Sequence, residues 1–189
     1  MFSTKTYAAR RNMLRTKIGS GIILLPGNSL SPNNYPNNAY YFRQDSSFRY
    51  YFGLNTPSLA GLIDADTGEE ALYGDDFTVE DIIWTGPQPT LREMGAGAGV
   101  TATFPMAELE KRLRRAISLG RRVHYLPPYR GETKLQLSAL LGINPNTVQK
   151  AFHMLEEEHL MESRTGTKSC MTLPPDILDA LRREVLSDE

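Results

Sequence analysis

The sequence has very little cysteine: Cys170 is the only one in 189 residues. A single cysteine excludes a disulfide within the chain and suits a reducing compartment, so we expect a cytoplasmic protein. No stretch approaches the roughly 18 consecutive apolar residues of a membrane span. The N-terminal segment MFSTKTYAARRNML carries charges where a signal peptide has an apolar run. We therefore expect no membrane partner.

A charge excess of either sign is also missing, because the formal net charge is −1. No overall field therefore draws the chain to nucleic acid or to an acidic membrane. The distribution is less even: Lys and Arg number 16 against 13 Asp and Glu up to Ile143, and 5 against 9 beyond it. A hydrophobic content of 40% with 23% charged residues is typical of a globular protein, and the length fits one domain with a small appendage.

Histidine is scarce as well, with only His124, His153 and His159. These three form no H-E-x-x-H or similar metal-ligand spacing with carboxylates. His124 lies in a predicted buried strand, where a hydrogen-bonded structural imidazole is favoured over a metal ligand. The sequence therefore offers no catalytic and no metal-binding residues.

Strand and helix signals alternate over the first 128 residues. Apolar runs or aromatic stretches predict strands, turn residues predict loops, and helical spacing predicts helices. The first expected elements are a helix over 4–17 with a basic outer face, a buried strand over 19–28, a loop over 29–42, an aromatic strand over 47–54 and a hairpin over 58–76. They are followed by a short helix or strand that begins at residue 79 and ends at Gly86 and Pro87, a strand within 95–104, an amphipathic helix over 106–120 ending at Gly120, and a buried strand over 121–128.

From Leu135 onward the signals are mainly helical. LQLSALLG predicts a helix that ends in a turn at Gly142, further helical spacing follows, and PPDILDALRREVL predicts a closing helix. Strands that alternate with helices indicate an α/β fold with a mixed sheet. We expect an α/β domain over residues 1–143 and a helical extension over residues 144–189.

Several blocks of the α/β part resemble a known family. YAARRNML, GIILLPGN, FRQDSSFRYYFGL, GLIDADTGEEALYGDD, DIIWTGPQPTL and VHYLPPYR occur in the order found in the N-terminal domain of aminopeptidase P, the creatinase/prolidase N-terminal domain. The likeness covers roughly Met1 to Ile143. It implies a mixed sheet flanked by helices. It also implies a non-catalytic domain that packs on a C-terminal catalytic domain and on neighbouring subunits, where it helps to wall off the substrate tunnel.

Catalysis in that family uses two metal ions, usually manganese, held by two Asp, one His and two Glu in the catalytic domain. Such a pair activates a bridging water for Xaa-Pro peptide hydrolysis. The resemblance ends before those ligands, so we expect no cofactor in this chain and a manganese pair only in the absent catalytic domain. Peptide hydrolysis by this chain alone is not expected. The implied partners are further copies of the chain or a catalytic-domain partner.

The family signature supplies the candidate site residues, which we expect to be structural or to line the substrate tunnel. Arg43, Gln44 and Asp45 would fix the turn from the loop into the aromatic strand, and aromatic side chains at strand spacing favour packing over a peptide pocket. For Trp84, packing is expected first and a tunnel wall second. The full set is Phe42, Arg43, Gln44, Asp45, Ser46, Ser47, Phe48, Tyr51 and Trp84.

A second resemblance begins at the end of the first. The sequence over about 139–171 is similar to the recognition helix and wing of a GntR-type winged helix-turn-helix, in a partial, winged-helix-like form. The resemblance implies a turn at Gly142, a helix that enters a DNA groove and a wing beyond it. The candidate DNA contacts are Asn146, Thr147, Gln149, Lys150, Arg164 and Lys168.

Other features of this segment disfavour DNA binding. His159 stands where the GntR pattern has a glycine, and the acidic balance beyond Ile143 opposes the phosphate contacts that dominate DNA affinity. A helical appendage that packs Phe152, Leu155 and Leu160 on the α/β body is the alternative. Three hypotheses remain: a non-catalytic accessory domain, a DNA-binding regulator whose α/β part senses a peptide or small ligand, and a peptidase subunit that docks with a separately encoded catalytic partner.

Overall fold

The computed structural model describes residues 2–35, 38–126 and 131–142. Contacts divide the chain after Leu126, so residues up to Leu126 form one compact unit and the last described helix belongs to a second. The helices are α1 (Thr4–Ile18), α2 (Ser46–Phe52), α3 (Val79–Thr85), α4 (Leu91–Ala98), α5 (Met106–Ser118) and α6 (Gly131–Leu141). The strands are β1 (Ile22–Pro26), β2 (Ala60–Asp64), β3 (Glu70–Tyr73), β4 (Ala102–Phe104) and β5 (Val123–Tyr125).

The five strands form one mixed sheet in the order β4-β3-β2-β1-β5. β2 pairs antiparallel with both β1 and β3, and the outer strands are parallel to their neighbours, β5 to β1 and β4 to β3. The predicted hairpin is confirmed as β2 and β3, whose turn is closed by Asp64: its Oδ1 accepts hydrogen bonds from the amides of Asp66 and Thr67 at 3.1 Å. The predicted α/β fold with a mixed sheet is therefore confirmed.

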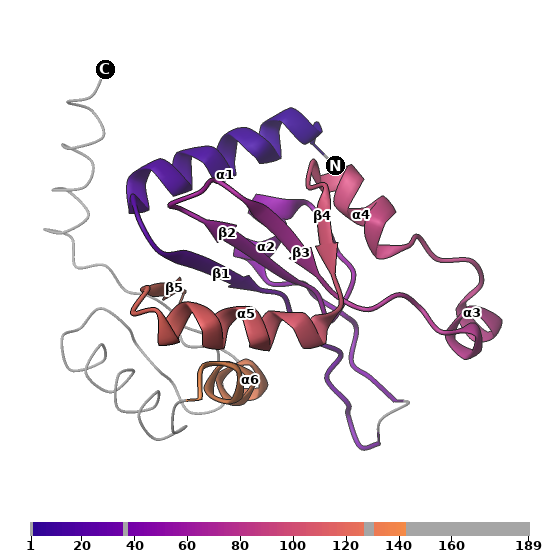
Figure 1. Cartoon of the computed structure of the whole chain (residues 1–189). Coiled ribbons are helices and arrows are strands. Elements are labelled where there is room, and N and C mark those ends of the chain that lie inside the picture. Colours follow the sequence, from indigo (N-terminus) through magenta and orange to yellow (C-terminus); the bar gives the residue numbers. More distant parts are fainter. Residues whose placement is uncertain (1, 36–37, 127–130, 143–189) are drawn as a thin grey trace, which may run out of the picture. The chain divides into compact units, whose positions relative to one another are not determined.

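One face of the sheet carries the main core. Side chains alternate along a strand, so Ile23, Leu25, Ile63 and Leu72 point to the same side. They pack with buried residues of α2, α4 and the connecting loops: Phe48, Phe52, Leu54, Leu59, Leu91, Met94, Ala98 and Val100. α5 lies on the opposite side of the sheet (Figure 1), and its apolar face buries Leu109, Leu113 and Ala116, as expected for the predicted amphipathic helix.

The predicted aromatic strand over 47–54 is wrong, because this stretch is the helix α2. Asp45 caps its first turn, with Oδ1 accepting from the Phe48 amide at 2.8 Å. Gly53 ends it in the left-handed conformation at φ 72°, which a residue with a Cβ rarely adopts. Asp45 and Gly53 flank the seven residues of α2. These two end signals favour a helix and outweigh the preference of the aromatic side chains for a strand.

Three further expectations need correction. The short helix or strand predicted to end at Gly86 and Pro87 is the helix α3, and the helix α4 follows where no separate element was predicted; each is started by a threonine capping box. β5 is half-buried along its length, whereas a buried strand was predicted. The His124 ring nitrogen lies 2.9 Å from the Ser20 carbonyl oxygen, as expected for a structural imidazole. The face of α1 expected to be outward and basic includes Arg11, which is fully buried.

α6 by itself agrees with the helix predicted from Leu135. It ends at Leu141, and Gly142 follows with φ 65°, the left-handed conformation expected for the predicted turn. The later helices predicted for the chain lie outside the described residues. In the part of the chain that the structure describes, no helix is both long enough and apolar enough to cross a bilayer.

Candidate interaction surface

The signature block around Gln44 holds the backbone together from the inside. Gln44 is 3% exposed, and its Oε1 accepts hydrogen bonds from the Asn28 amide at 2.6 Å and from the Asp45 amide at 2.8 Å. Its Nε2 donates to the Thr56 carbonyl oxygen at 2.7 Å. One buried amide thus joins the exit of β1, the start of α2 and the loop that leads to β2, which is a structural role.

The other signature residues separate into core and surface. Phe48 is buried, while Phe42 and Tyr51 are half-buried. Arg43 has an exposed side chain, and its carbonyl oxygen accepts from the Asn28 side chain at 2.9 Å. Asp45 caps α2 through its side chain, which accepts from the Phe48 amide. Gln44, Asp45 and Phe48 therefore support α2. Ser46 and Tyr51 instead line two separate open clefts.

Trp84 is different, because it lies on α3, where no residue is buried. The Trp84 side chain is 82% exposed in the described unit and does not pack in its core, with Val79 at 76% and Ile83 at 74% exposed beside it. Figure 1 shows α3 away from the sheet, at the end of two connecting segments. Large apolar side chains gathered on an exposed element mark an interaction site more often than a free surface.

We call residues 77–90 the α3 arm, and none of them is buried. Its base is closed by two aspartates that follow β3. Asp76 Oδ1 accepts from the Leu91 amide at 2.6 Å, which joins the two ends of the arm, and Asp75 Oδ1 accepts from the Met106 amide at 3.1 Å at the start of α5. Sequence reasoning missed both residues. The sequence signal for this role is a pair of acidic residues that follows a strand and precedes several helices. Carboxylates favour the exposed backbone N–H groups at the starts of helices.

The arm also has its own local order. The Thr78 side chain accepts from the Asp81 amide at 3.2 Å, and Asp81 Oδ2 accepts from the Thr78 amide at 2.9 Å. These hydrogen bonds from the Thr78 side chain and backbone lower the pKa of Asp81, so the cap is ionised at neutral pH. Pro87 and Pro89 then restrict the return segment. These hydrogen bonds and prolines therefore restrict the conformations of the segments that connect the exposed apolar helix to the rest of the fold.

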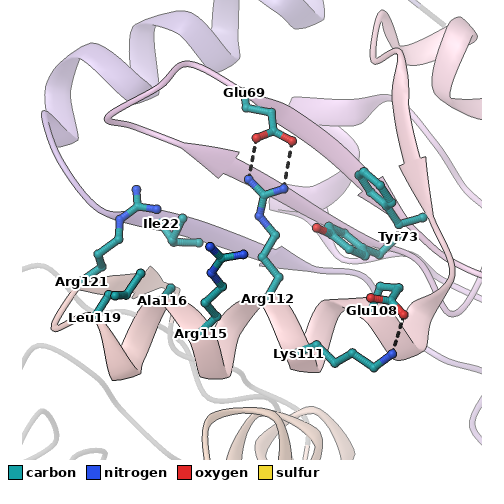
Figure 2. A pocket seen from close by; sticks show the side chains of 11 residues that line it. Ile22, Glu69, Tyr73, Glu108, Lys111, Arg112, Arg115, Ala116, Leu119 and Arg121 are labelled. Carbon is teal, nitrogen blue, oxygen red and sulfur yellow. Dashed lines mark hydrogen bonds and ion pairs between the residues drawn. The ribbon is translucent and has the colours of Figure 1, made fainter.

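A second feature is an open groove of about 550 Å³ beside α5, which we call the α5 groove. Figure 2 shows α5 contributing a row of charged side chains that face residues of the sheet. Arg112 donates to both carboxylate oxygens of Glu69, at 2.9 and 2.7 Å, and the Lys111 ammonium lies 2.6 Å from Glu108. The positive charge of the groove is thus largely neutralised within it.

Glu69, which lines the α5 groove, and the nearby buried Asp64 have lowered pKa values. Burial acts to raise the pKa of Asp64, but hydrogen bonds from Arg121 at 2.6 and 2.9 Å and from the Thr67 and Asp66 amides outweigh it. The hydrogen bonds from Arg112 lower the pKa of Glu69 against a smaller effect of burial. Both carboxylates are therefore held ionised as partners of arginines and not as proton donors.

The residues present do not fit a metal pair. Among the described residues, no three His, Cys, Asp or Glu side chains lie together in a way that could hold a metal ion. No hydrolytic step through manganese is therefore derived from this part of the chain. The six candidate DNA contacts, from Asn146 to Lys168, lie outside the described residues.

Comparisons with known proteins agree with the fold. The family model of the aminopeptidase P N-terminal domain matches residues 7–125. An Escherichia coli aminopeptidase P variant solved with substrate is 18% identical, with a TM-score of 0.63 over 96% of this chain and 42% of that one. Pseudomonas aeruginosa aminopeptidase PepP is 21% identical, with a TM-score of 0.63 over 86% and 39%. Proline aminopeptidase P II from Yersinia pestis is 18% identical, with a TM-score of 0.61 over 87% and 41%.

The chain spans 27% to 42% of the length of the solved proteins that it resembles. A search of curated proteins finds no match to the sequence. The GntR-type resemblance over 139–171 has no support in these comparisons, because the family match ends at residue 125.

Proposed function

Because the chain belongs to the aminopeptidase P N-terminal domain family, we propose that it is a non-catalytic accessory domain of a Xaa-Pro metalloaminopeptidase system. In this proposal the α3 arm docks on a catalytic domain, and Trp84 forms part of the wall that gates the entry of substrate. Manganese would be bound by that catalytic domain. The cytoplasm remains the proposed compartment, on the ground of the single cysteine.

The observation that carries the proposal is the exposure of α3. Folding normally removes large apolar side chains from water, which stabilises the protein by about 25 cal/mol per Å² buried. Val79, Ile83 and Trp84 give up this gain in the described unit. Aromatic side chains such as Trp are also the commonest residues at the energetic centre of protein interfaces. A docking partner that covers α3 would recover the lost burial.

The lengths of the related proteins support a catalytic domain as the partner. The matched domain is the N-terminal part of solved proteins that extend well beyond it, since this chain covers at most 42% of the related structures described above. The part that these proteins have in addition is the natural neighbour of this fold. The described residues hold no group of side chains that could bind a metal ion. In this proposal the neighbouring domain therefore performs the chemistry, and this chain positions it.

Coexpression tests the proposal. The full 189-residue chain would be produced together with an aminopeptidase P-type catalytic polypeptide from the same genome, and the complex would be measured by analytical ultracentrifugation. We expect a complex that Trp84→Ser and Ile83→Ser each weaken at least about tenfold. Gln88→Ser, also on the exposed arm, is the matched control and should bind like the wild type.

Absence of any complex, or a complex indifferent to Trp84→Ser, would contradict the proposal. A concentration-dependent dimer of this chain that Trp84→Ser abolishes would assign the arm to a second copy instead. Xaa-Pro peptides with added manganese should stay intact with this chain alone and be cleaved only with the catalytic polypeptide present.

The DNA-binding regulator remains the alternative proposal for the segment beyond α6. Its supporting observation is that α6 ends at Leu141 and is followed by Gly142 with φ 65°, a helix end that is compatible with a helix-turn-helix. A salt titration with random duplex DNA decides it. Phosphate contacts make log affinity fall linearly with log salt concentration, so a complete lack of binding at low salt removes the regulator.

A further inference from the structure

A second open cleft, of about 510 Å³, lies between the start of α1 and the exposed side of α2. We call it the Arg10 cleft. Its lining combines aromatic rings with two arginines and one amide: Phe2, Tyr7, Arg10, Arg49, Tyr50 and Asn55. It is a different surface from both the α3 arm and the α5 groove, and nothing in the proposed function uses it.

The guanidinium of Arg10 is fixed in this cleft. Its central carbon lies 4.0 Å from the ring centre of Tyr50 and 4.7 Å from that of Phe2, and its Nη1 donates to the Tyr50 carbonyl oxygen at 3.0 Å. Contact with two aromatic rings limits the conformations of the side chain, so little entropy is lost when its other N–H groups bind a ligand. Arg10 is thus preorganised as a donor.

The charge of the Arg10 cleft is also uncompensated. Its lining includes Arg10 and Arg49 but no Asp or Glu, and neither arginine forms an ion pair with any residue in the described ranges. The α5 groove shows the contrast, because there Arg112 and Lys111 are each paired with a carboxylate (Figure 2). Two unpaired guanidinium groups in a cleft lined by rings favour an anion with two charges.

We propose that the Arg10 cleft binds a phosphate group. A phosphate monoester carries a charge of roughly −1.5 to −2 at neutral pH, which matches two arginines, and its oxygens fit the paired N–H groups of a guanidinium. Arg10 would be the fixed donor and Arg49 the second cation, with the Asn55 amide beside them. The exposed rings of Phe2 and Tyr50 would contact the organic part of an ester.

Isothermal titration of the full chain at constant ionic strength tests the proposal, with inorganic phosphate and phenyl phosphate as probes and chloride as the competing anion. We expect saturable binding that Arg10→Gln weakens about tenfold or more and that Arg49→Gln also weakens, since each removes charge-assisted hydrogen bonds. Arg92→Gln, an exposed arginine on α4, should change nothing. Equal affinity for both probes indicates a free anion as the ligand, and preference for phenyl phosphate indicates an ester.

Binding that does not exceed the chloride background would overturn the proposal. Equal effects of Arg10→Gln and Arg92→Gln would do the same. Unfolding midpoints without ligand check that the variants are folded. If Arg10→Gln is not folded, Arg49→Gln decides alone, because the Arg49 side chain is exposed and contacts no aromatic ring among the described residues; unchanged phosphate affinity in this variant would then refute the site.

Discussion

Arg11 donates a hydrogen bond from Nε to Glu70 Oε2 at 2.8 Å, with the arginine fully buried and the glutamate 22% exposed. The same guanidinium donates from Nη1 to the carbonyl oxygens of Tyr51 at 2.9 Å and Ala98 at 3.0 Å. It therefore connects α1 with β3, with the last turn of α2 and with the end of α4. A buried arginine of this kind is tolerated because both its charge and its donors are satisfied.

We predict that Arg11→Met destabilises the protein by about 3 kcal/mol. Methionine has a similar length but leaves Glu70 and the carbonyl oxygens of Tyr51 and Ala98 without this donor. Urea unfolding of the purified chain measures the change. Arg92→Met on the exposed surface of α4 is the control, and it should cost less than about 0.5 kcal/mol. A similar small cost for Arg11→Met would show that the buried arginine is not essential to the packing of these elements.

Gln44→Leu should destabilise the protein by roughly 2–4 kcal/mol. Leucine fills much of the same space but leaves the amides of Asn28 and Asp45 without an acceptor and the Thr56 carbonyl oxygen without a donor. The exposed Gln88→Leu serves as the control. Equal unfolding midpoints of the two variants would contradict the role of Gln44 as an internal connector of the loops around α2.

The stability of the fold should fall in acid through Asp64. Its pKa is lower in the folded protein than in the unfolded chain, mainly because hydrogen bonds from Arg121 outweigh the opposing effect of burial. A group of this kind stabilises the fold fully above its unfolded pKa, about 4, and the contribution disappears as the pH falls through the folded pKa. Glu69 adds to the same loss, because hydrogen bonds from Arg112 lower its pKa.

Arg121→Gln tests this contribution. The variant should lose roughly 1–2 kcal/mol at pH 7 and show a weaker decline of stability below pH 4. Arg114→Gln removes a more exposed pair with Glu110 and should change little at any pH. Urea unfolding across the acid range measures both. If the stability of both variants depends on pH in the same way, the ion pair of Asp64 with Arg121 does not determine the loss of stability in acid.

Trp84 is the only tryptophan, so its fluorescence reports on the α3 arm alone. An indole that is 82% exposed should emit as in water and be quenched efficiently by iodide. We expect the catalytic polypeptide to shift the emission to shorter wavelength and to protect it from iodide. The Ile83→Ser variant should keep the free spectrum but lose the protection. A shielded indole in the isolated chain would mean that α3 is already covered.

The sequence was informative where local signals agreed. The apolar runs at β1 and β2, the turn between β2 and β3 and the amphipathic α5 all combine pattern with end signals, and each was predicted correctly. The α2 helix was missed because Tyr50, Tyr51 and Phe52 favour strands, whereas the decisive residues were its ends, Asp45 and Gly53. Local propensity is a weak prior when caps and tertiary packing oppose it.

The surfaces could not be predicted in the same way. Val79, Ile83 and Trp84 have the composition of a core element, and only the three-dimensional arrangement shows that no other described element covers them. The Arg10 cleft was also invisible, because Phe2 and Tyr50 are 48 positions apart in the chain and meet only when α1 packs beside α2. Arg11 next to it has the same chemistry and yet faces inward, so residue type alone did not separate the two.

The hydrogen bond from the Leu91 amide to Asp76 has a consequence for how this fold can diversify. Since the ends of the segment are tied at its root, its length and composition can change without disturbing the sheet beneath. Swapping residues 77–90 for a short glycine-serine linker, or for a foreign recognition peptide, should leave a folded scaffold with a new binding preference. Under the docking role proposed above, an exchange of residues 77–90 would change the partner while the fold keeps its stability.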